Sequence, residues 1–190
     1  MIRTSIKTET AGSALLTTAQ ARTHLREEWV DATNDAYIDS LVAAAQSWVE
    51  KFTNRKLTAA TFDLNLTGFP KEIVLPYSPI NEITHIKYYT GGVLTTLNAA
   101  DYYYSIYEEP CRILPVGSWP TVDDNIFAVQ VRFKTGYTAP DACPASIIDA
   151  VGRLLTDMYE NRGNTLKERQ ELMHVLLWPN RVFHSTEENR

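Results

Sequence analysis

The clearest structural signal in the chain is the stretch Phe127-Ala128-Val129-Gln130-Val131-Arg132-Phe133-Lys134. Large apolar residues at every second position alternate with Ala128, Gln130, Arg132 and Lys134, which is the period of a strand with one buried face. We therefore predict a strand here, as the last member of a β-rich zone.

Other strands are expected upstream of this stretch. Phe62, Leu64 and Leu66 alternate with polar neighbours in the same way. Shorter strands are predicted at residues 72–75, 83–89, 93–97, 102–107 and 112–114. Thr90-Gly91-Gly92 fits a hairpin turn, because glycine reaches positive φ without penalty. Short turns between strands favour an antiparallel sheet.

Helical patterns flank the β-rich zone. Thr17-Thr18-Ala19-Gln20 has the form of a capping box, so a first helix is expected to begin near Thr17. A longer helix is predicted from Asn34 or Asp35 to about Asn54, a residue that tolerates the left-handed conformation at a helix end. Its buried face is expected to contain Ile38, Leu41, Ala45, Trp48 and Phe52.

A third helix is expected to open at Pro144, which suits the first helical position. Together these patterns predict an α+β protein. A helical bundle would be built from the N-terminal and C-terminal helices, with an antiparallel β region inserted between them. The expected boundaries place residues 1–57 and 139–190 in one helical domain and residues 58–138 in the inserted β-rich region.

Composition narrows the class of protein. Of the 190 residues, 44% are hydrophobic and 22% are charged, which is ordinary for a globular protein. The net charge is −5 and the basic residues are scattered, so a protein that grips DNA is not expected. The chain contains no run of 18 apolar residues, which is about the length that a membrane-spanning helix needs.

The cellular compartment follows from the start of the chain and the cysteines. Residues 1–7 contain no apolar run of the kind that forms a signal peptide. Cys111 and Cys143 lack metal spacing and are interpreted as two reduced thiols, with a disulfide as the less favoured alternative. A cytosolic product is therefore expected.

The sequence lacks the spacings of histidine, cysteine, serine and glycine residues that mark common catalytic and metal sites. No two of the four histidines stand at the i, i+4 spacing of a helical zinc site, and there is no phosphate loop, nucleophile elbow or Cys-x-x-Cys pair. The carboxylate pairs Glu27-Glu28 and Asp123-Asp124 are interpreted as solvated loops, and Glu160 with Arg162 as an ordinary ion pair. We predict that the protein is not an enzyme and needs no cofactor or metal.

Four tyrosines are the most unusual feature of the β-rich zone: Tyr102, Tyr103, Tyr104 and Tyr107. The favoured interpretation is that alternate tyrosines pack into the core and the others lie at its rim. The alternative is a partner surface on which tyrosines stack against sugars or a protein.

Several short motifs follow one another over residues 15–183. In chain order they are Leu16-Thr17-Thr18-Ala19-Gln20, Leu41-Val42-Ala43-Ala44-Ala45, Thr53-Asn54-Arg55-Lys56-Leu57, Leu66-Thr67-Gly68-Phe69-Pro70, Ile73-Val74-Leu75-Pro76, Trp119-Pro120, Val129-Gln130-Val131-Arg132-Phe133-Lys134-Thr135-Gly136-Tyr137, Pro144-Ala145-Ser146-Ile147-Ile148, Met158-Tyr159-Glu160-Asn161-Arg162 and Leu176-Leu177-Trp178-Pro179-Asn180-Arg181-Val182. This succession resembles the head–tail connector (adaptor) family of long-tailed phages, prophages and gene-transfer particles. Residues 164–172 depart from the family's pattern.

The resemblance implies a structural virion protein. Its subunits would form a ring, typically twelve-fold, beneath the portal protein and join the DNA-filled head to the tail. A stopper or tail-completion protein would bind the other face, and DNA would pass through the channel without specific binding. The protein would be in the host cytoplasm during assembly and then in the virion neck.

The resemblance also implies that the C-terminal segment contacts the portal, through Leu176, Leu177, Trp178, Arg181, Val182 and Phe183. A short apolar run with Trp and Arg is typical of interface anchors. An equally weighted alternative is a last helix that folds back onto the chain's own core. For the protein as a whole, the alternative function is a monomeric glycan- or protein-binding module that uses the four tyrosines.

Overall fold

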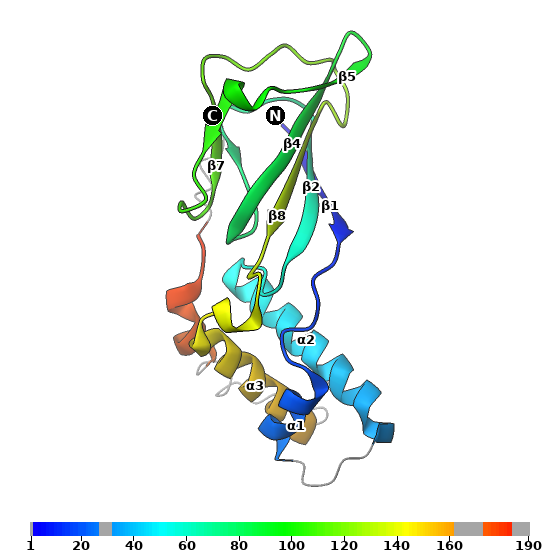
Figure 1. Cartoon of the computed structure of the whole chain (residues 1–190), viewed down its shortest axis with the longest axis vertical. Helices are drawn as coiled ribbons and strands as arrows, with labels where there is room; N and C mark the ends of the chain where they lie inside the picture. Colours follow the sequence, from blue (N-terminus) through cyan, green and yellow to red (C-terminus); the bar gives the residue numbers. More distant parts are fainter. Residues whose placement is uncertain (1, 27–31, 162–172, 184–190) are drawn as a thin grey trace. The chain divides into compact units, whose positions relative to one another are not determined.

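The computed structural model describes residues 2–26, 32–161 and 173–183 (Figure 1). Contacts divide these residues into two units that interleave along the chain. The β unit comprises residues 2–12, 59–136 and 182–183, and the helical unit comprises residues 13–26, 32–58, 137–161 and 173–181. Three features singled out above involve residues outside the described ranges: the Glu27-Glu28 pair, Arg162 and the stretch at residues 164–172.

The β unit contains two antiparallel sheets. The larger has the strand order β1-β2-β8-β4-β5, with β1 at Thr4–Thr10, β2 at Ala60–Leu66, β8 at Val129–Thr135, β4 at Ile80–Thr90 and β5 at Val93–Thr96. The smaller has the order β3-β7-β6, with β3 at Ile73–Val74, β7 at Arg112–Pro115 and β6 at Tyr102–Tyr104. A 3-10 turn, η2 at Ala99–Asp101, precedes β6.

The two sheets share one hydrophobic core. The predicted alternation along β2 and β8 is confirmed: Phe62 pairs with Phe133 and Leu64 with Val131, and all four side chains are buried. Ile113 of the smaller sheet is buried in the same cluster. The prediction was wrong for Phe127, which lies before β8 and is exposed, because the chain enters the strand only at Val129.

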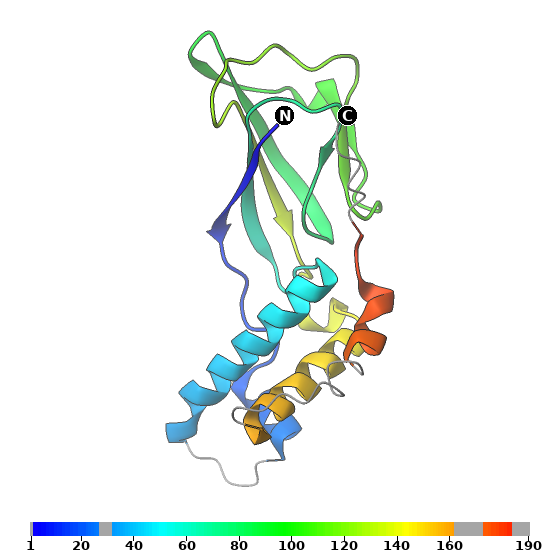
Figure 2. The ribbon, with the colours of Figure 1, turned by 180° about the vertical axis from the view of Figure 1, so that it is seen from behind.

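The helical unit contains α1 (Thr18–Leu25), α2 (Asp35–Thr53) and α3 (Ala145–Glu160), with α2 and α3 side by side in both views (Figures 1 and 2). The predicted capping box is confirmed, since Thr17 accepts from the Gln20 N–H and the Gln20 side chain accepts from the Thr17 N–H. Asn54 closes α2 in the left-handed conformation, with φ of 56°. Pro144 is the residue before α3, not its first.

The buried stripe of α2 lies slightly to one side of the predicted face. Ile38, Val42, Ala45 and Val49 are fully buried, whereas Leu41, Trp48 and Phe52 pack around the edge of the core. Close packing of α1 on α3 depends on a residue without a side chain. A Cβ at Gly152 would lie 2.5 Å from the His24 ring and would clash with it. The absence of a side chain at Gly152 therefore leaves room for the His24 ring.

The predicted fold class was wrong. The chain is not a helical bundle of terminal helices with a β insertion. The described residues form eight strands in two antiparallel sheets, together with the helices α1, α2 and α3. The N-terminal region also contributes a strand, β1, in which every residue is exposed. An all-exposed strand has no apolar period, so only its pairing with β2 reveals it.

Within the described ranges, no helix combines the length and the apolar character needed to span a membrane.

Candidate interaction surfaces

The C-terminal segment is anchored in the helical unit. Residues 173–177 are helical and lead into a 3-10 turn, η4, at Trp178–Asn180. Met173 and Leu177 are buried in the hydrophobic core of the unit, and Leu176 packs against it. This much of the segment folds back onto the chain's own core.

Polar and aromatic contacts hold the end of this segment. Arg55 Nε donates a hydrogen bond to the Asn180 carbonyl at 2.6 Å, and Asn180 Nδ2 donates to Ser146 Oγ at 3.1 Å. The Arg181 guanidinium carbon lies 5.3 Å from the centroid of the Phe52 ring and 5.6 Å from that of Trp178. Both distances are within the range of a cation–π interaction. The backbone from η4 to Arg181 is therefore fixed against α2 and α3.

The six residues predicted to contact a portal differ in exposure. Leu177 and Val182 are buried, and Leu176 and Arg181 are half-buried. Trp178 and Phe183 are 54% and 55% exposed. The segment thus offers two large apolar side chains to solvent, next to others that hold it in place.

The four tyrosines do not form one platform. Tyr102 and Tyr104 share a face of β6, with ring centroids 6.3 Å apart, and Tyr102 packs against the core of the β unit. Burial, with a smaller effect of Tyr104, raises the pKa of Tyr102. Tyr103 lies on the opposite face of the strand and is 56% exposed, while Tyr107 follows the strand and is 91% exposed.

An exposed apolar group at the β4–β5 hairpin was missed in the sequence. Val93 and Leu94 begin β5 and are both exposed. The Asp123 carboxylate accepts hydrogen bonds from the Gly91 and Gly92 N–H groups at 2.9 and 2.8 Å, which ties the residue 116–127 loop to the hairpin. The signal that could have revealed it is Val93-Leu94 directly after a two-glycine turn.

The polar face of the larger sheet carries a charge network. Arg132 forms two hydrogen bonds of 2.7 Å with Asp63 and lies 3.7 Å from Glu9, which also pairs with Lys7. Hydrogen bonds from Arg132 lower the pKa of the Asp63 carboxyl. Burial lowers the pKa of His85, which is paired with Arg132 in the next strand. These charges neutralise one another and link neighbouring strands.

Possible metal ligands and the two thiols can be placed in the described part of the chain. No group of three or more His, Cys, Asp or Glu side chains gathers there in a way that could hold a metal ion. Cys111 and Cys143 are free and buried, and burial raises the pKa of each thiol to about 11. A thiol with so high a pKa is a poor nucleophile at neutral pH.

Solved structures resemble this chain over nearly its whole length. No family model and no curated protein matches it. A chain from the neck of an empty gene transfer agent particle, computed with C6 symmetry, has a TM-score of 0.83. The match covers 98% of this chain and 100% of that chain at 24% identity. This chain has the fold of a gene transfer agent neck protein.

Two further structures agree with this resemblance. A chain from the virion of a native gene transfer agent particle has a TM-score of 0.80 at 24% identity, covering 96% of this chain and 97% of that one. A chain from the neck of the native particle, computed with C12 symmetry, has a TM-score of 0.73 at 22% identity, covering 97% and 100%. The family resemblance predicted from the order of motifs is confirmed at the level of fold.

Proposed function

We propose that this chain is a structural subunit of the neck of a long-tailed phage, prophage or gene-transfer particle. It acts as a head–tail connector, or adaptor, that assembles into a ring beneath the portal and joins the DNA-filled head to the tail. The observation that carries the proposal is the similarity to neck structures across the whole chain, at a TM-score of 0.83. A partial likeness would have left the role of one unit open.

Ring assembly is supported by the symmetry of the similar particles. Their necks were computed with C6 and C12 symmetry, and a ring of twelve subunits is compatible with both. A closed ring requires two different complementary surfaces on each subunit, because neighbours meet head to tail. The exposed apolar side chains at the β4–β5 hairpin and at the end of the chain are candidates for such surfaces.

Portal contact is assigned to the C-terminal segment, with separate roles for its residues. Trp178 and Phe183 would insert into the portal, since their side chains are exposed. Leu176, Leu177, Arg181 and Val182 would hold the segment in position, since they are wholly or partly buried. A large aromatic side chain on a fixed backbone is the kind of anchor that dominates binding energy at interfaces.

The charge of the chain suits a DNA conduit. The net charge is −5, and Arg112, Arg132 and Arg153 all form ion pairs with carboxylates of the same chain. A net-negative subunit is compatible with a channel wall that lets DNA slide, because tight binding of phosphates would slow the passage of DNA. A stopper or tail-completion protein would bind the opposite face of the ring. Assembly would occur in the host cytoplasm, before the ring becomes part of the virion neck.

A second candidate function is a monomeric module that binds glycans or proteins through its tyrosines. The exposure of Tyr103 and Tyr107 favours it, because exposed tyrosines are common at binding surfaces. The separation of the tyrosines onto two faces of β6 weighs against a single stacking platform.

The deciding experiment measures native mass over a range of concentrations, with negative-stain images and a binding assay against the portal from the same genome. Closed rings, or rings formed only on the portal, are expected. Trp178→Ala should impair portal binding, whereas Tyr103→Ala should not. A chain that stays monomeric and does not bind the portal contradicts the proposal, and glycan or protein capture abolished by Tyr103→Ala would favour the second candidate.

A further inference from the structure

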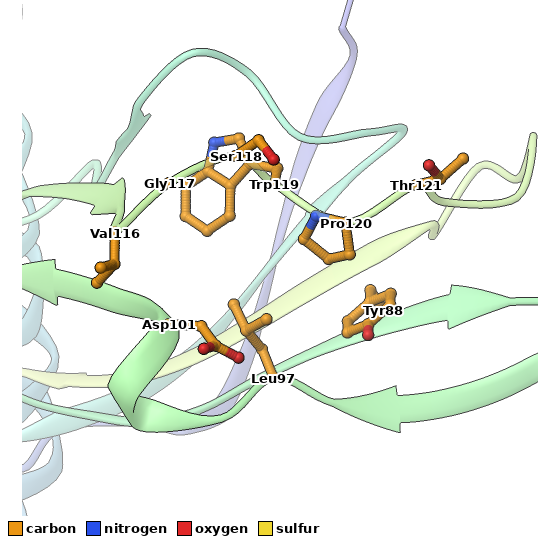
Figure 3. Close-up of a pocket in the computed structure, with 9 residues that line it drawn as sticks. All are labelled: Tyr88, Leu97, Asp101, Val116, Gly117, Ser118, Trp119, Pro120 and Thr121. Carbon is orange, nitrogen blue, oxygen red and sulfur yellow. The ribbon is translucent and has the colours of Figure 1, made fainter.

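A pocket of about 500 Å³ lies in the β unit, beside the β4–β5 hairpin. Its walls include Tyr88, Leu97, Asp101, Val116, Trp119 and Pro120. Figure 3 shows Trp119 and Pro120 on one wall and Tyr88, Leu97 and Asp101 on the facing one. The pocket belongs to neither surface discussed above, so its purpose is a separate question.

The lining combines polar groups with two aromatic side chains, those of Trp119 and Tyr88. Phe69 stacks on the Trp119 indole, with ring centroids 4.6 Å apart and planes 5° apart. That contact leaves the other indole face and the ring edge for the pocket, and it holds the ring still. The indole Nε1 is buried and has no hydrogen-bond partner in the described part of the chain. A buried nitrogen is not accessible to a ligand, so Trp119 presents only its π surface.

Asp101 is the single ionisable carboxylate among the lining residues. Its backbone is fixed at both ends, because its N–H donates to the Asn98 carbonyl at 3.0 Å and its carbonyl accepts from the Val116 N–H at 2.9 Å. The side chain is exposed, and the described residues offer its carboxylate no hydrogen bond or ion pair. Asp124 is the matched case in the same unit: exposed, likewise without such a partner, and outside this pocket.

A carboxylate on a fixed backbone, beside two aromatic rings, suits a long cationic side chain. The hydrocarbon stem of such a side chain covers apolar surface while its charged end remains near water. A planar guanidinium stacks on aromatic rings and pairs with a carboxylate at the same time, which a lysine ammonium does less well. We propose that this pocket receives an arginine side chain of a partner protein, packed against Trp119 and Tyr88 and paired with Asp101.

Net charge favours a different protein over a second copy of this chain, because two copies that each carry a charge of −5 repel one another. In the β unit, Arg112 and Arg132 are already paired with Glu72 and Asp63 of their own chain. Arg3 is the remaining arginine in the described part of that unit. The inference goes beyond the proposed neck function and does not depend on it, because the pocket lies within one unit of a single chain.

The test uses the full chain with N-acetyl-arginine amide as the probe and its neutral analogue N-acetyl-citrulline amide as the comparison. Binding is followed by NMR through the indole N–H signals of the four tryptophans. The arginine probe should shift the Trp119 signal saturably and leave the other three unchanged. Asp101→Asn should weaken binding roughly fivefold, the factor expected for one partly exposed ion pair, and citrulline should bind no better than that variant.

Asp124→Asn is the control, because it removes the same charge outside the pocket. It should bind the arginine probe as the unchanged protein does. Equal binding of citrulline, equal weakening by Asp124→Asn, or no shift at Trp119 would overturn the proposal. A Trp119 shift that develops with protein concentration alone would identify a second copy as the occupant and overturn the assignment to a partner protein.

Discussion

Asp63 on β2 and Arg132 on β8 lie opposite each other and form two hydrogen bonds, Nε to Oδ1 and Nη2 to Oδ2, both 2.7 Å long. Glu9 on β1 lies 3.7 Å from the same guanidinium. One arginine thus connects three neighbouring strands on the polar face of the larger sheet, where hydrophobic contacts cannot do so.

Removing the Asp63 charge should loosen this connection. Asp63→Asn leaves one hydrogen-bond acceptor in place of a two-point ionic contact, so the free energy of unfolding should fall by about 1 kcal/mol. Urea unfolding at pH 7 measures the change. Glu82→Gln breaks the more exposed Lys134 pair of the same sheet and should have a smaller effect; a larger effect for Glu82→Gln would contradict this account.

The same pair predicts a pH dependence. Hydrogen bonds from Arg132 hold the pKa of Asp63 below its ordinary value of 3.8. A lowered folded pKa means that the stabilisation is complete above the unfolded value and is lost as the pH falls through the folded pKa. Between pH 5 and pH 2, roughly, the unchanged protein should therefore lose more stability than Asp63→Asn. Urea unfolding of both proteins at several pH values in this range measures the loss. An equal loss of stability in the two proteins would mean that Asp63 contributes nothing to the pH dependence.

Asp123 should control the order of the β4–β5 hairpin. Its carboxylate accepts from both glycine N–H groups of the turn, where φ is 59° and 76°. Asp123→Ala should speed hydrogen exchange at the Gly91 and Gly92 amides about tenfold, with little change in global stability, because the turn is exposed. Asp124→Ala alters the adjacent carboxylate and should leave both rates unchanged. Unchanged exchange in Asp123→Ala would mean that the glycines alone fix the turn.

Neighbouring residues of the C-terminal segment should respond differently to truncation. Leu177 is fully buried in the helical unit, so Leu177→Ala should lower the free energy of unfolding by about 3 kcal/mol. Trp178 is exposed and adds a cation–π contact with Arg181, so Trp178→Ala should cost about 1 kcal/mol or less. Urea unfolding separates the two, and the reverse order of effects would show that the segment does not pack as described.

The two native cysteines should be unreactive in the folded protein. Both thiols are buried and have a pKa of about 11, so roughly one in a thousand is ionised at pH 8. A chromogenic disulfide reagent should label neither within minutes at that pH and should label both in denaturant. Tyr107→Cys, at a position 91% exposed, should react at once. Rapid labelling of a native thiol would reveal local opening around it.

Features set by short-range rules were predictable from the sequence. The capping box at Thr17, the end of α2 at Asn54 and the inward positions of β2 depend on residues close together in the chain. The fold class was not predictable in the same way. β1 has no buried residue, so its sequence carries no apolar period, and only pairing with a strand some 50 residues later makes it part of a sheet.

The candidate surfaces, too, were only partly predictable from the sequence. An apolar segment with Trp178 and Arg181 can be recognised in the sequence as an anchor, but which of its residues face solvent depends on how the turn sits on α2 and α3. The pocket was missed because Tyr88, Asp101 and Trp119 come from separate segments. None of them is unusual in its own neighbourhood, so no local pattern marks them.

By itself, then, the sequence determined the capped start of α1, the end of α2 and the inward positions of β2, because capping and hydrophobic period act between near neighbours. The tertiary structure alone decided the addition of β1 to the sheet, the burial of Leu177 beside an exposed Trp178, and the meeting of Asp63 with Arg132 across 69 residues. Such contacts depend on which distant segments share a core, and that choice is made by packing of the whole chain.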